Sequence, residues 1–170
     1  MTKAQTLEYL GVARRHFKDT FEVDGDKAFI NHVSASVEMA QAYADGTGDA
    51  PDADDLHFHM EEGPENVWNK KVLELLLQGL KQRIEDEDET LRSPTPSDAY
   101  WMQLLKNKYS TVRSHWRAGV SRKTAGGRLE TSDEVIARVE EMYDSKGLKA
   151  RKAQRRQTVR LVVQSINHHC

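Results

Sequence analysis

The chain of 170 residues is poor in the residues that cross-link or punctuate a fold, with one cysteine, four prolines and ten glycines. The single thiol, Cys170, can form no disulfide within the chain, and it has no partner thiols for a cysteine-rich zinc cluster. Few glycines and prolines disfavour an all-β fold, which needs many tight turns. No run of 18 apolar residues is present, and the N-terminal sequence MTKAQTLEYL lacks the apolar stretch of a secretory signal. We therefore expect an intracellular protein without a membrane span.

The chain also lacks the short motifs that mark common catalytic and nucleotide-binding sites. It contains no G-x-S-x-G, no G-x-x-x-x-G-K-[ST], no H-E-x-x-H and no C-x-x-C. Most of its 27 acidic residues fall in runs typical of solvated surface, not of a buried pocket. We expect a protein that is not an enzyme and has no catalytic residue, cofactor or metal site; an unfamiliar catalytic site stays open as an alternative.

Charge is the abundant feature, and it is segregated along the chain. The formal net charge is −2, but residues 1–95 hold 10 Lys and Arg against 20 Asp and Glu, whereas residues 96–170 hold 15 against 7. The acidic half can pack against the basic half, or the basic half can bind a polyanion while the acidic half suppresses indiscriminate binding.

A block of five acids and a proline-rich stretch mark the point where the charge changes sign. Residues 85–89 read EDEDE, and residues 93–97 read SPTPS, where the two prolines cannot continue a helix. The sequence therefore predicts an acidic helical subdomain at 1–84, an acidic and proline-containing linker at 85–97, and a basic helical subdomain at 98–170.

Apolar residues recur at helical spacing through most of the chain. Capping boxes are expected at Thr2 with Gln5 and at Thr131 with Glu134. Glycines or prolines end the segments between them. The helices predicted in this way cover about residues 3–19, 26–44, 64–85, 98–118, 132–146 and 148–166. No segment alternates strictly between polar and apolar residues, so the predicted fold class is all-α, a bundle of about six helices with Trp68 and Leu76 anchoring its core.

Residues 45–63 are rich in Asp and Gly and show no apolar periodicity, which predicts a mobile acidic loop. Within it, His57 and His59 flank Phe58 among several carboxylates, a pattern that can ligate a divalent metal. Two histidines one residue apart converge on an ion most readily from a strand, and this segment has no strand character. A loop without metal is therefore the favoured interpretation.

The basic half contains the strongest functional signal. Seven cations and no acid lie between residues 146 and 160, and positions 149, 152, 156 and 160 share one broad stripe of a helix. Further cations lie on the helix at 98–118 and in the glycine-containing loop after it. Phosphate backbones are the commonest partner of such a stripe. The alternative is a helix face that is solvated or paired with acids of the same protein.

The stretch from Gln103 to Arg117, QLLKNKYSTVRSHWR, resembles the third helix of Myb/SANT-like trihelix DNA-binding domains. The tryptophan-led helix that begins at Val67-Trp68 is similar to the first helix of that family, and the resemblance covers about residues 66–128. It implies a helix that reads the DNA major groove, with aromatic residues inward and polar and basic residues outward. The acidic block and SPTPS stand where that family has its second helix.

Together these features predict a nucleic-acid-binding helical module, with DNA favoured over RNA, an intracellular and nuclear location, and no membrane partner. The alternative is a helical protein-interaction or oligomerisation scaffold. The residues expected to contact nucleic acid are Lys106, Asn107, Arg113, Arg117, Arg122, Lys123, Lys149, Lys152, Arg156 and Arg160.

Overall fold

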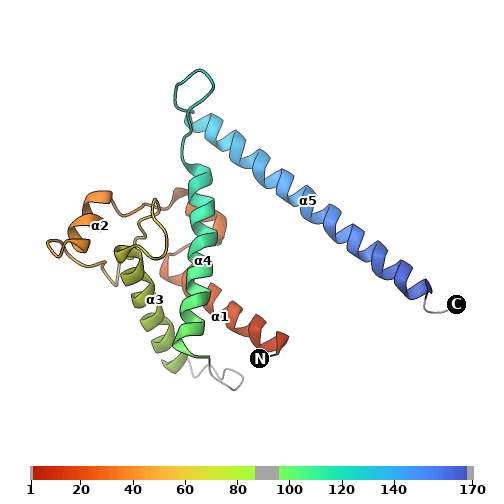
Figure 1. The fold of residues 1–170 in the computed structure, drawn as a ribbon, viewed down its shortest axis with the longest axis horizontal. Helices are drawn as coiled ribbons and strands as arrows, with labels where there is room; N and C mark the ends of the chain where they lie inside the picture. Colours follow the sequence, from red (N-terminus) through yellow and green to blue (C-terminus); the bar gives the residue numbers. More distant parts are fainter. Residues whose placement is uncertain (1, 87–95, 168–170) are drawn as a thin grey trace. The chain divides into compact units, whose positions relative to one another are not determined.

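A computed structural model describes residues 2–86 and 96–167, with side chains in the C-terminal helix described as far as Lys149. Helices form nearly all the regular structure of these residues, so the predicted all-α fold is confirmed. In chain order they are α1 (Lys3–Thr20), the 3-10 helix η1 (Asp26–Asn31), α2 (Val37–Ala44), α3 (Val67–Asp86), α4 (Asp98–Gly119) and α5 (Ser132–Asn167) (Figure 1).

These elements divide into two compact units, Met1–Ala118 and Gly119–Cys170. The division expected at the charge reversal, residues 85–97, differs from this, because α4 packs in the same core as the acidic half. Trp101 on α4 lies in one apolar cluster with Tyr9 of α1 and Leu80 of α3. Most of the expected linker, residues 87–95, lies outside the described residues.

Helix α1 forms as its capping signal predicts. The Thr2 side chain accepts a hydrogen bond from the backbone N–H of Gln5, and the Gln5 side chain accepts one from the backbone N–H of Thr2. The buried residues of this helix recur every three or four positions and form one face: Tyr9, Val12, Ala13, His16 and Phe17.

Helices α1 and α3 approach closely where a histidine lies opposite a glycine. The His16 Nε2–H donates to the backbone carbonyl of Leu76 at 2.8 Å. A Cβ atom on Gly79 would lie 3.2 Å from His16 Cε1, which is tighter than an ordinary contact. Burial lowers the pKa of His16, because the charged imidazolium is disfavoured away from water. Gly79 therefore permits the close packing of these two helices.

The helix predicted at residues 26–44 is wrong. The chain forms η1, then an extended stretch at residues 32–36, and only then α2, which Ser36 caps by accepting from the N–H of Met39 at 3.1 Å. The extended stretch pairs with a distant segment instead: the N–H of Ala35 donates to the carbonyl of Phe58 at 2.9 Å. Tertiary pairing thus replaced a local helix that apolar spacing alone favoured. One result is that Val33 is 70% exposed and does not join the core.

The interpretation of residues 45–63 as a mobile acidic loop also has to be corrected. Phe58 and Met60 are fully buried, and Leu56 is nearly so. Phe58 stacks on Phe17 with ring centroids 5.9 Å apart. These three apolar residues alternate along the chain, as expected for an extended segment that pairs with residues 33–35. The alternation covers only five residues among many acids, so the sequence alone did not indicate it.

A buried amide holds this segment against α3 and α4. The Asn69 side chain is fully buried; it accepts from the N–H of His59 at 2.9 Å and donates to the His59 carbonyl at 2.9 Å. It also donates to the Tyr109 hydroxyl at 3.1 Å, and that hydroxyl donates to the Glu62 carbonyl at 2.6 Å. Burial raises the pKa of Tyr109 to about 12, so the phenol keeps its proton. Both polar side chains are therefore satisfied inside the core.

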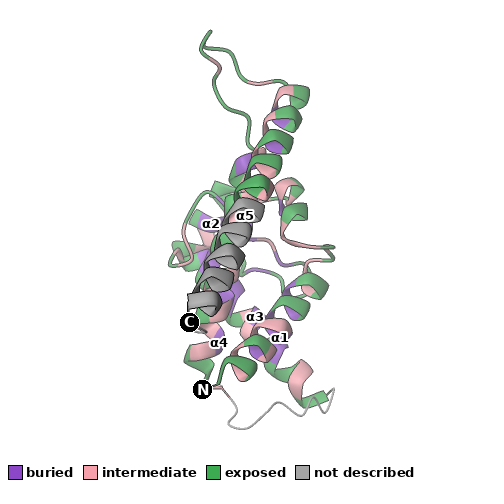
Figure 2. Ribbon diagram, turned by 90° about the vertical axis from the view of Figure 1, so that its right-hand side faces the viewer, coloured by how far each residue is buried: buried purple, intermediate pink, exposed green. Residues whose placement is uncertain are grey.

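Helices α3 and α4 carry the apolar stripes that their sequences predict. Trp68 and Leu76 are 3% and 1% exposed, which confirms them as core residues. Ser97 caps α4 by accepting from the N–H of Tyr100 at 3.3 Å. Figure 2 marks the buried residues of unit 1, which on α4 are Trp101, Leu105, Tyr109, Val112 and Ala118.

The two helices predicted at 132–146 and 148–166 are one continuous helix, α5. Gly147 lies in its interior and does not end it. A glycine inside a helix costs only about 0.5 to 1 kcal/mol relative to alanine. Good helix formers flank it, including Lys146 and Leu148, and no proline follows to stop the helix. The break expected at this glycine is therefore wrong.

Candidate nucleic-acid interface

Unit 2 begins with a short hairpin-like loop that leads into α5. The N–H of Thr124 donates to the carbonyl of Arg128, and the N–H of Glu130 donates to the carbonyl of Arg122, both at 2.8 Å. Gly127 closes the tip with a φ of +82°, a conformation that glycine adopts without strain. This loop gives the cations after α4 a defined backbone.

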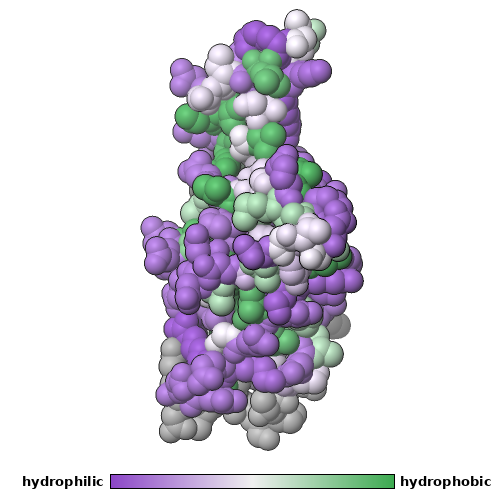
Figure 3. Space-filling model, turned by 90° about the vertical axis from the view of Figure 1, so that its left-hand side faces the viewer, coloured by the Kyte–Doolittle hydropathy of each residue, from purple (hydrophilic) through white to green (hydrophobic). Residues whose placement is uncertain are grey.

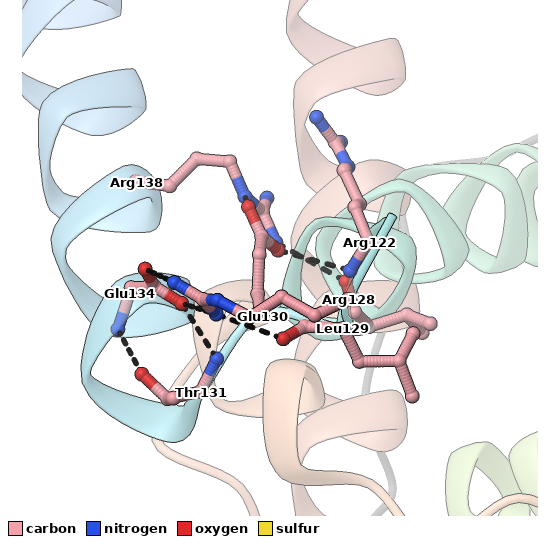
Figure 4. A network of polar contacts seen from close by, with 8 residues as sticks. Arg122, Arg128, Leu129, Glu130, Thr131, Glu134 and Arg138 are labelled. Atoms are coloured by element: carbon pink, nitrogen blue, oxygen red, sulfur yellow. Dashed lines mark hydrogen bonds and ion pairs between the residues drawn. The ribbon is translucent and has the colours of Figure 1, made fainter. Parts of the chain in front are cut away.

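Two ion pairs join the loop to the first turns of α5 (Figure 4). Arg128 binds the Glu134 carboxylate through both of its terminal nitrogens, at 2.7 and 2.5 Å. Arg138 binds the Glu130 carboxylate in the same two-bond manner, at 2.9 and 2.8 Å. Such paired bonds fix the planes of both groups and so define the approach of the loop to the helix.

Glu134 also completes the predicted capping box. Its carboxylate accepts from the N–H of Thr131 at 2.8 Å, and its own N–H donates to the Thr131 hydroxyl at 3.4 Å. The hydrogen bond from Arg128 and the one from Thr131 lower the pKa of Glu134 to about 2. The start of α5 is therefore held by an ionised carboxylate at neutral pH.

Four cations of unit 2 stand apart from these pairs. The Arg122 guanidinium points away from the carboxylates in Figure 4, although it is close enough to contribute to the lowered pKa of Glu130. The side chains of Lys123, Lys146 and Lys149 are exposed, and none of them forms an ion pair with a carboxylate in the described part of the chain. Arg128, by contrast, forms an ion pair with Glu134.

The other predicted contacts of the C-terminal half follow along α5. Lys152, Arg156 and Arg160 are within the helix Ser132–Asn167, and their side chains lie outside the described residues. Their spacing of three to four residues from Lys149 onward places all four positions along one stripe of the helix. No Asp or Glu occurs after Asp144, so this part of α5 contains no acid to neutralise them.

The predicted contacts on α4 have a different environment, because they bind other parts of unit 1. Lys106 donates to the Glu65 carboxylate at 2.6 Å and lowers the pKa of that carboxyl. Arg113 donates to the backbone carbonyls of Met60, at 2.8 Å, and Glu61. These cations hold the 56–62 segment and its neighbours in place.

The exposed face of α4 is polar and almost uncharged. Asn107 lies on it and accepts from the Gln103 side chain at 2.9 Å. Arg117 is exposed at the end of the helix and makes one long hydrogen bond, 3.4 Å, to the Glu61 carbonyl. Ser110, Thr111 and Ser114 are also exposed on this face. The predicted contact residues therefore divide between the two units.

The two histidines considered as metal ligands bind backbone carbonyls. The His57 Nδ1–H donates to the carbonyl of Val33 at 3.0 Å, and the His59 Nδ1–H donates to that of Ala35 at 3.1 Å. In the described part of the chain no group of three or more His, Cys, Asp or Glu residues is placed to hold a metal ion. The H-x-H pattern thus belongs to the pairing of two extended segments.

Comparison with known proteins gives no relative from which a role could be transferred. No family model, no curated protein sequence and no solved structure matches the chain. None of the helices in the described residues is long and apolar enough to cross a membrane.

Proposed function

We propose that the protein is a non-enzymatic nucleic-acid-binding module that contacts phosphates through unit 2. The observation that supports this most directly is the continuity of α5 through Gly147. Because the helix does not break there, the seven cations between residues 146 and 160 belong to one helix whose segment after Asp144 contains no acid. A rigid row of cations neutralises successive phosphates and releases their counterions.

The loop before α5 contributes two more exposed cations to unit 2. Arg122 and Lys123 precede the ion-paired Arg128, and their side chains are exposed. Because Glu130 pairs with Arg138 and Glu134 pairs with Arg128, these two carboxylates repel a phosphate less than free carboxylates would. The proposed contact set in unit 2 is Arg122, Lys123, Lys149, Lys152, Arg156 and Arg160.

The role of α4 follows from where its cations point. The Myb/SANT-like resemblance implies a helix that contacts bases in the DNA major groove. Such a helix needs cations next to its base-contacting residues, because contacts to the phosphates position it on the duplex. Lys106 and Arg113 bind within unit 1, so Arg117 is the remaining predicted α4 cation that is exposed. Phosphate binding by α5 is accordingly proposed as the main contact, and base reading by Asn107 and Arg117 as a secondary one.

The proposal is tested by measuring the salt dependence of binding to a labelled DNA duplex. If about five of these cations meet phosphates, the slope of log affinity against log salt is about −4.5. Reversal of charge in Arg156→Glu with Arg160→Glu should weaken binding to every sequence alike and reduce the slope by about 2. The same titration with single-stranded RNA tests the preference for DNA.

A matched pair of variants separates contact by α5 from general electrostatic attraction. Lys146→Glu with Lys149→Glu changes the net charge as much as Lys70→Glu with Lys81→Glu does, but the second pair lies on α3, where both lysines pair with acids. We expect the α5 pair to weaken binding at least tenfold and the α3 pair to weaken it about twofold. Equal loss in both pairs, or no duplex or RNA binding at about 50 mM salt, contradicts the proposal.

The α4 contribution has its own readout. Arg113→Ala should lower the melting temperature, because the carbonyl of the buried residue Met60 loses its side-chain donor, while the salt slope stays the same. Asn107→Ala should leave stability unchanged and alter the preference between DNA sequences only if α4 enters a groove.

A scaffold function is the second candidate, and exposed apolar residues in unit 2 favour it. Val120, Leu129, Ile136 and Leu148 are between 43% and 62% exposed. Binding of a partner or a second copy would remove these apolar side chains from water, which is the usual driving force of association. If the protein sediments as a stable oligomer that Leu129→Ser with Ile136→Ser dissociates, and it binds no nucleic acid, this function replaces the first.

A further inference from the structure

A groove of about 710 Å³ lies within unit 1, between α2, the segment that follows it and the start of α3. Its apolar walls include Val33, Met39 and Trp68. Val33 and Met39 are 70% and 56% exposed, whereas Trp68 is buried and donates from Nε1 to the His57 carbonyl at 2.8 Å. Figure 3 views the side of the molecule on which α2 lies, where apolar surface shows between polar residues. The groove therefore combines exposed apolar side chains with a buried tryptophan whose ring is held by a hydrogen bond.

The charge around the groove has one sign. Asp49, Asp52 and Asp55 line it, and no Lys or Arg is among its lining residues in the described part of the chain. Asp55 pairs with His57 at 3.0 Å, and Asp52 accepts from the backbone N–H of Asp54 at 3.0 Å. Neither contact involves a lysine or arginine, so the three carboxylates keep most of their negative field.

We propose that this groove binds a cationic peptide segment of a partner protein, in which Lys or Arg residues flank a bulky apolar residue. The apolar side chain packs between Val33 and Met39, and the flanking cations meet Asp49, Asp52 and Asp55. Each ion pair is weak at an exposed position, so a ligand that makes two or three of them around a buried apolar anchor is favoured over a single free amine. The proposal does not depend on nucleic-acid binding by α5.

The test uses the full-length chain and a fluorescein-labelled synthetic peptide of sequence RKLKRFKR, followed by fluorescence anisotropy at about 50 mM salt. We expect saturable binding that Asp49→Asn with Asp52→Asn weakens about tenfold, since two exposed ion pairs are lost. Asparagine keeps an oxygen that can accept the Asp54 bond, so the fold is expected to remain intact. Met39→Ala should weaken binding about fivefold, because the apolar anchor loses part of its wall.

Matched controls distinguish the groove from general acidity. Glu140→Gln with Glu141→Gln removes the same charge from exposed positions on α5 and should leave the affinity within twofold. The peptide RKAKRAKR should bind about fivefold more weakly, and EELEEFEE should not bind. In NMR spectra of the full chain, the Trp68 indole and the Val33 and Met39 methyl signals should shift on titration.

Several results would overturn the proposal. These are equal binding by wild type and the Asp49/Asp52 variant, an equal loss in the Glu140/Glu141 variant, or equal binding of the acidic peptide. Self-association of the free chain that the Asp49/Asp52 variant abolishes, without peptide binding, would assign the groove to a second copy of this chain instead.

Discussion

The two units differ in how many of their cations are paired, although α4 of unit 1 and all of unit 2 belong to the basic half of the sequence. In unit 1, Lys106 pairs with Glu65 at 2.6 Å, and Lys81 pairs with Asp98 at 3.0 Å. In unit 2, Arg128 and Arg138 are paired, while Lys146 and Lys149 are exposed without a carboxylate partner in the described residues. The positions of Lys and Arg in the sequence do not show which of them form ion pairs. The cations available to bind a polyanion are those that remain without a carboxylate partner in the folded protein.

The units also differ in how completely they bury their apolar residues. Unit 1 buries aromatic side chains from α1, α4 and the segment before α3, including Tyr9, Phe58 and Trp101. Among residues 119–149 only Val135 and Val139 are buried. Unit 1 therefore has a core of its own, whereas unit 2 relies on helix caps and ion pairs around a long helix.

The largest expected effect tests this contrast in packing. Phe58→Ala should destabilise unit 1 by about 3 to 5 kcal/mol, because it removes a fully buried ring. Ile136→Ala, at a position 56% exposed in unit 2, should change stability by less than about 0.5 kcal/mol. Urea unfolding followed by tryptophan fluorescence checks unit 1, since all three tryptophans lie there. A loss below about 1 kcal/mol for Phe58→Ala would mean that residues 56–60 are not part of the core.

Removal of the buried amide should have a somewhat smaller effect. Asn69→Ala should cost about 3 kcal/mol, because the backbone groups of His59 lose their partners inside the core. Asn107→Ala is the matched control on the exposed face of α4 and should cost less than about 0.5 kcal/mol. The same fluorescence-detected unfolding gives both values. Similar losses in the two variants would show that the Asn69 network does not hold the segment.

A third prediction concerns the pH dependence of unit 1. Burial, with a smaller contribution from nearby His57, lowers the pKa of His32 to about 4. Its Nε2 is buried without a hydrogen-bond partner in the described residues, and its ring packs on Phe29 at 5.2 Å. The unfolded chain takes up the proton near pH 6.5 and the folded chain only near 4, so stability should fall by up to about 3 kcal/mol across that window.

His32→Phe provides the comparison for this pH dependence. The variant keeps the aromatic contact and removes the titrating group, so its unfolding free energy should fall less between pH 6.5 and 4 than that of the wild type. Urea unfolding at four or five pH values gives the free energy of unfolding of each protein. The difference between the two values isolates His32, because both proteins contain the same carboxylates. Parallel curves for the two proteins would contradict the assignment to His32.

The smallest effect is expected at the start of α5 in unit 2. The pKa of Glu134 is lowered to about 2, so its stabilising bonds are present above pH 4.5 and are lost as pH falls from 4.5 towards 2. Glu134→Gln should show faster amide hydrogen exchange at Thr131 already at pH 6, because the Arg128 ion pair is gone. Glu141→Gln is the control and should exchange as the wild type does. Equal protection at Thr131 in the wild type and Glu134→Gln would show that the capping contacts are dispensable.

Some of the fold could be predicted because the signals are local. The Thr2–Gln5 and Thr131–Glu134 capping boxes are short-range hydrogen bonds between residues three apart, and both are present. The apolar stripe of α4 follows from the period of the helix, with Trp101 and Tyr109 buried as expected. The starts of α1 and α5 and the core face of α4 were therefore accessible from the sequence alone.

The candidate site was predictable only in part. The sequence alone located the cations on α4 and α5, since it contains their spacing and the absence of acids after Asp144. It could not indicate that Arg113 binds carbonyls 52 and 53 residues away, nor that Gly147 lies inside a helix. The same limit applies to Phe58, whose partners come from distant segments, α1 and α4.

The sequence by itself determined the all-α class, the caps at Thr2, Ser97 and Thr131, and the apolar faces of α1, α3 and α4, because each depends on residues within one or two helical turns of one another. Only the tertiary structure decided which cations are paired, where residues 26–44 stop being helical and why residues 56–60 are buried. These outcomes depend on hydrogen bonds and packing between segments 20 to 60 residues apart. Such contacts are stabilised by burial, which local periodicity does not encode.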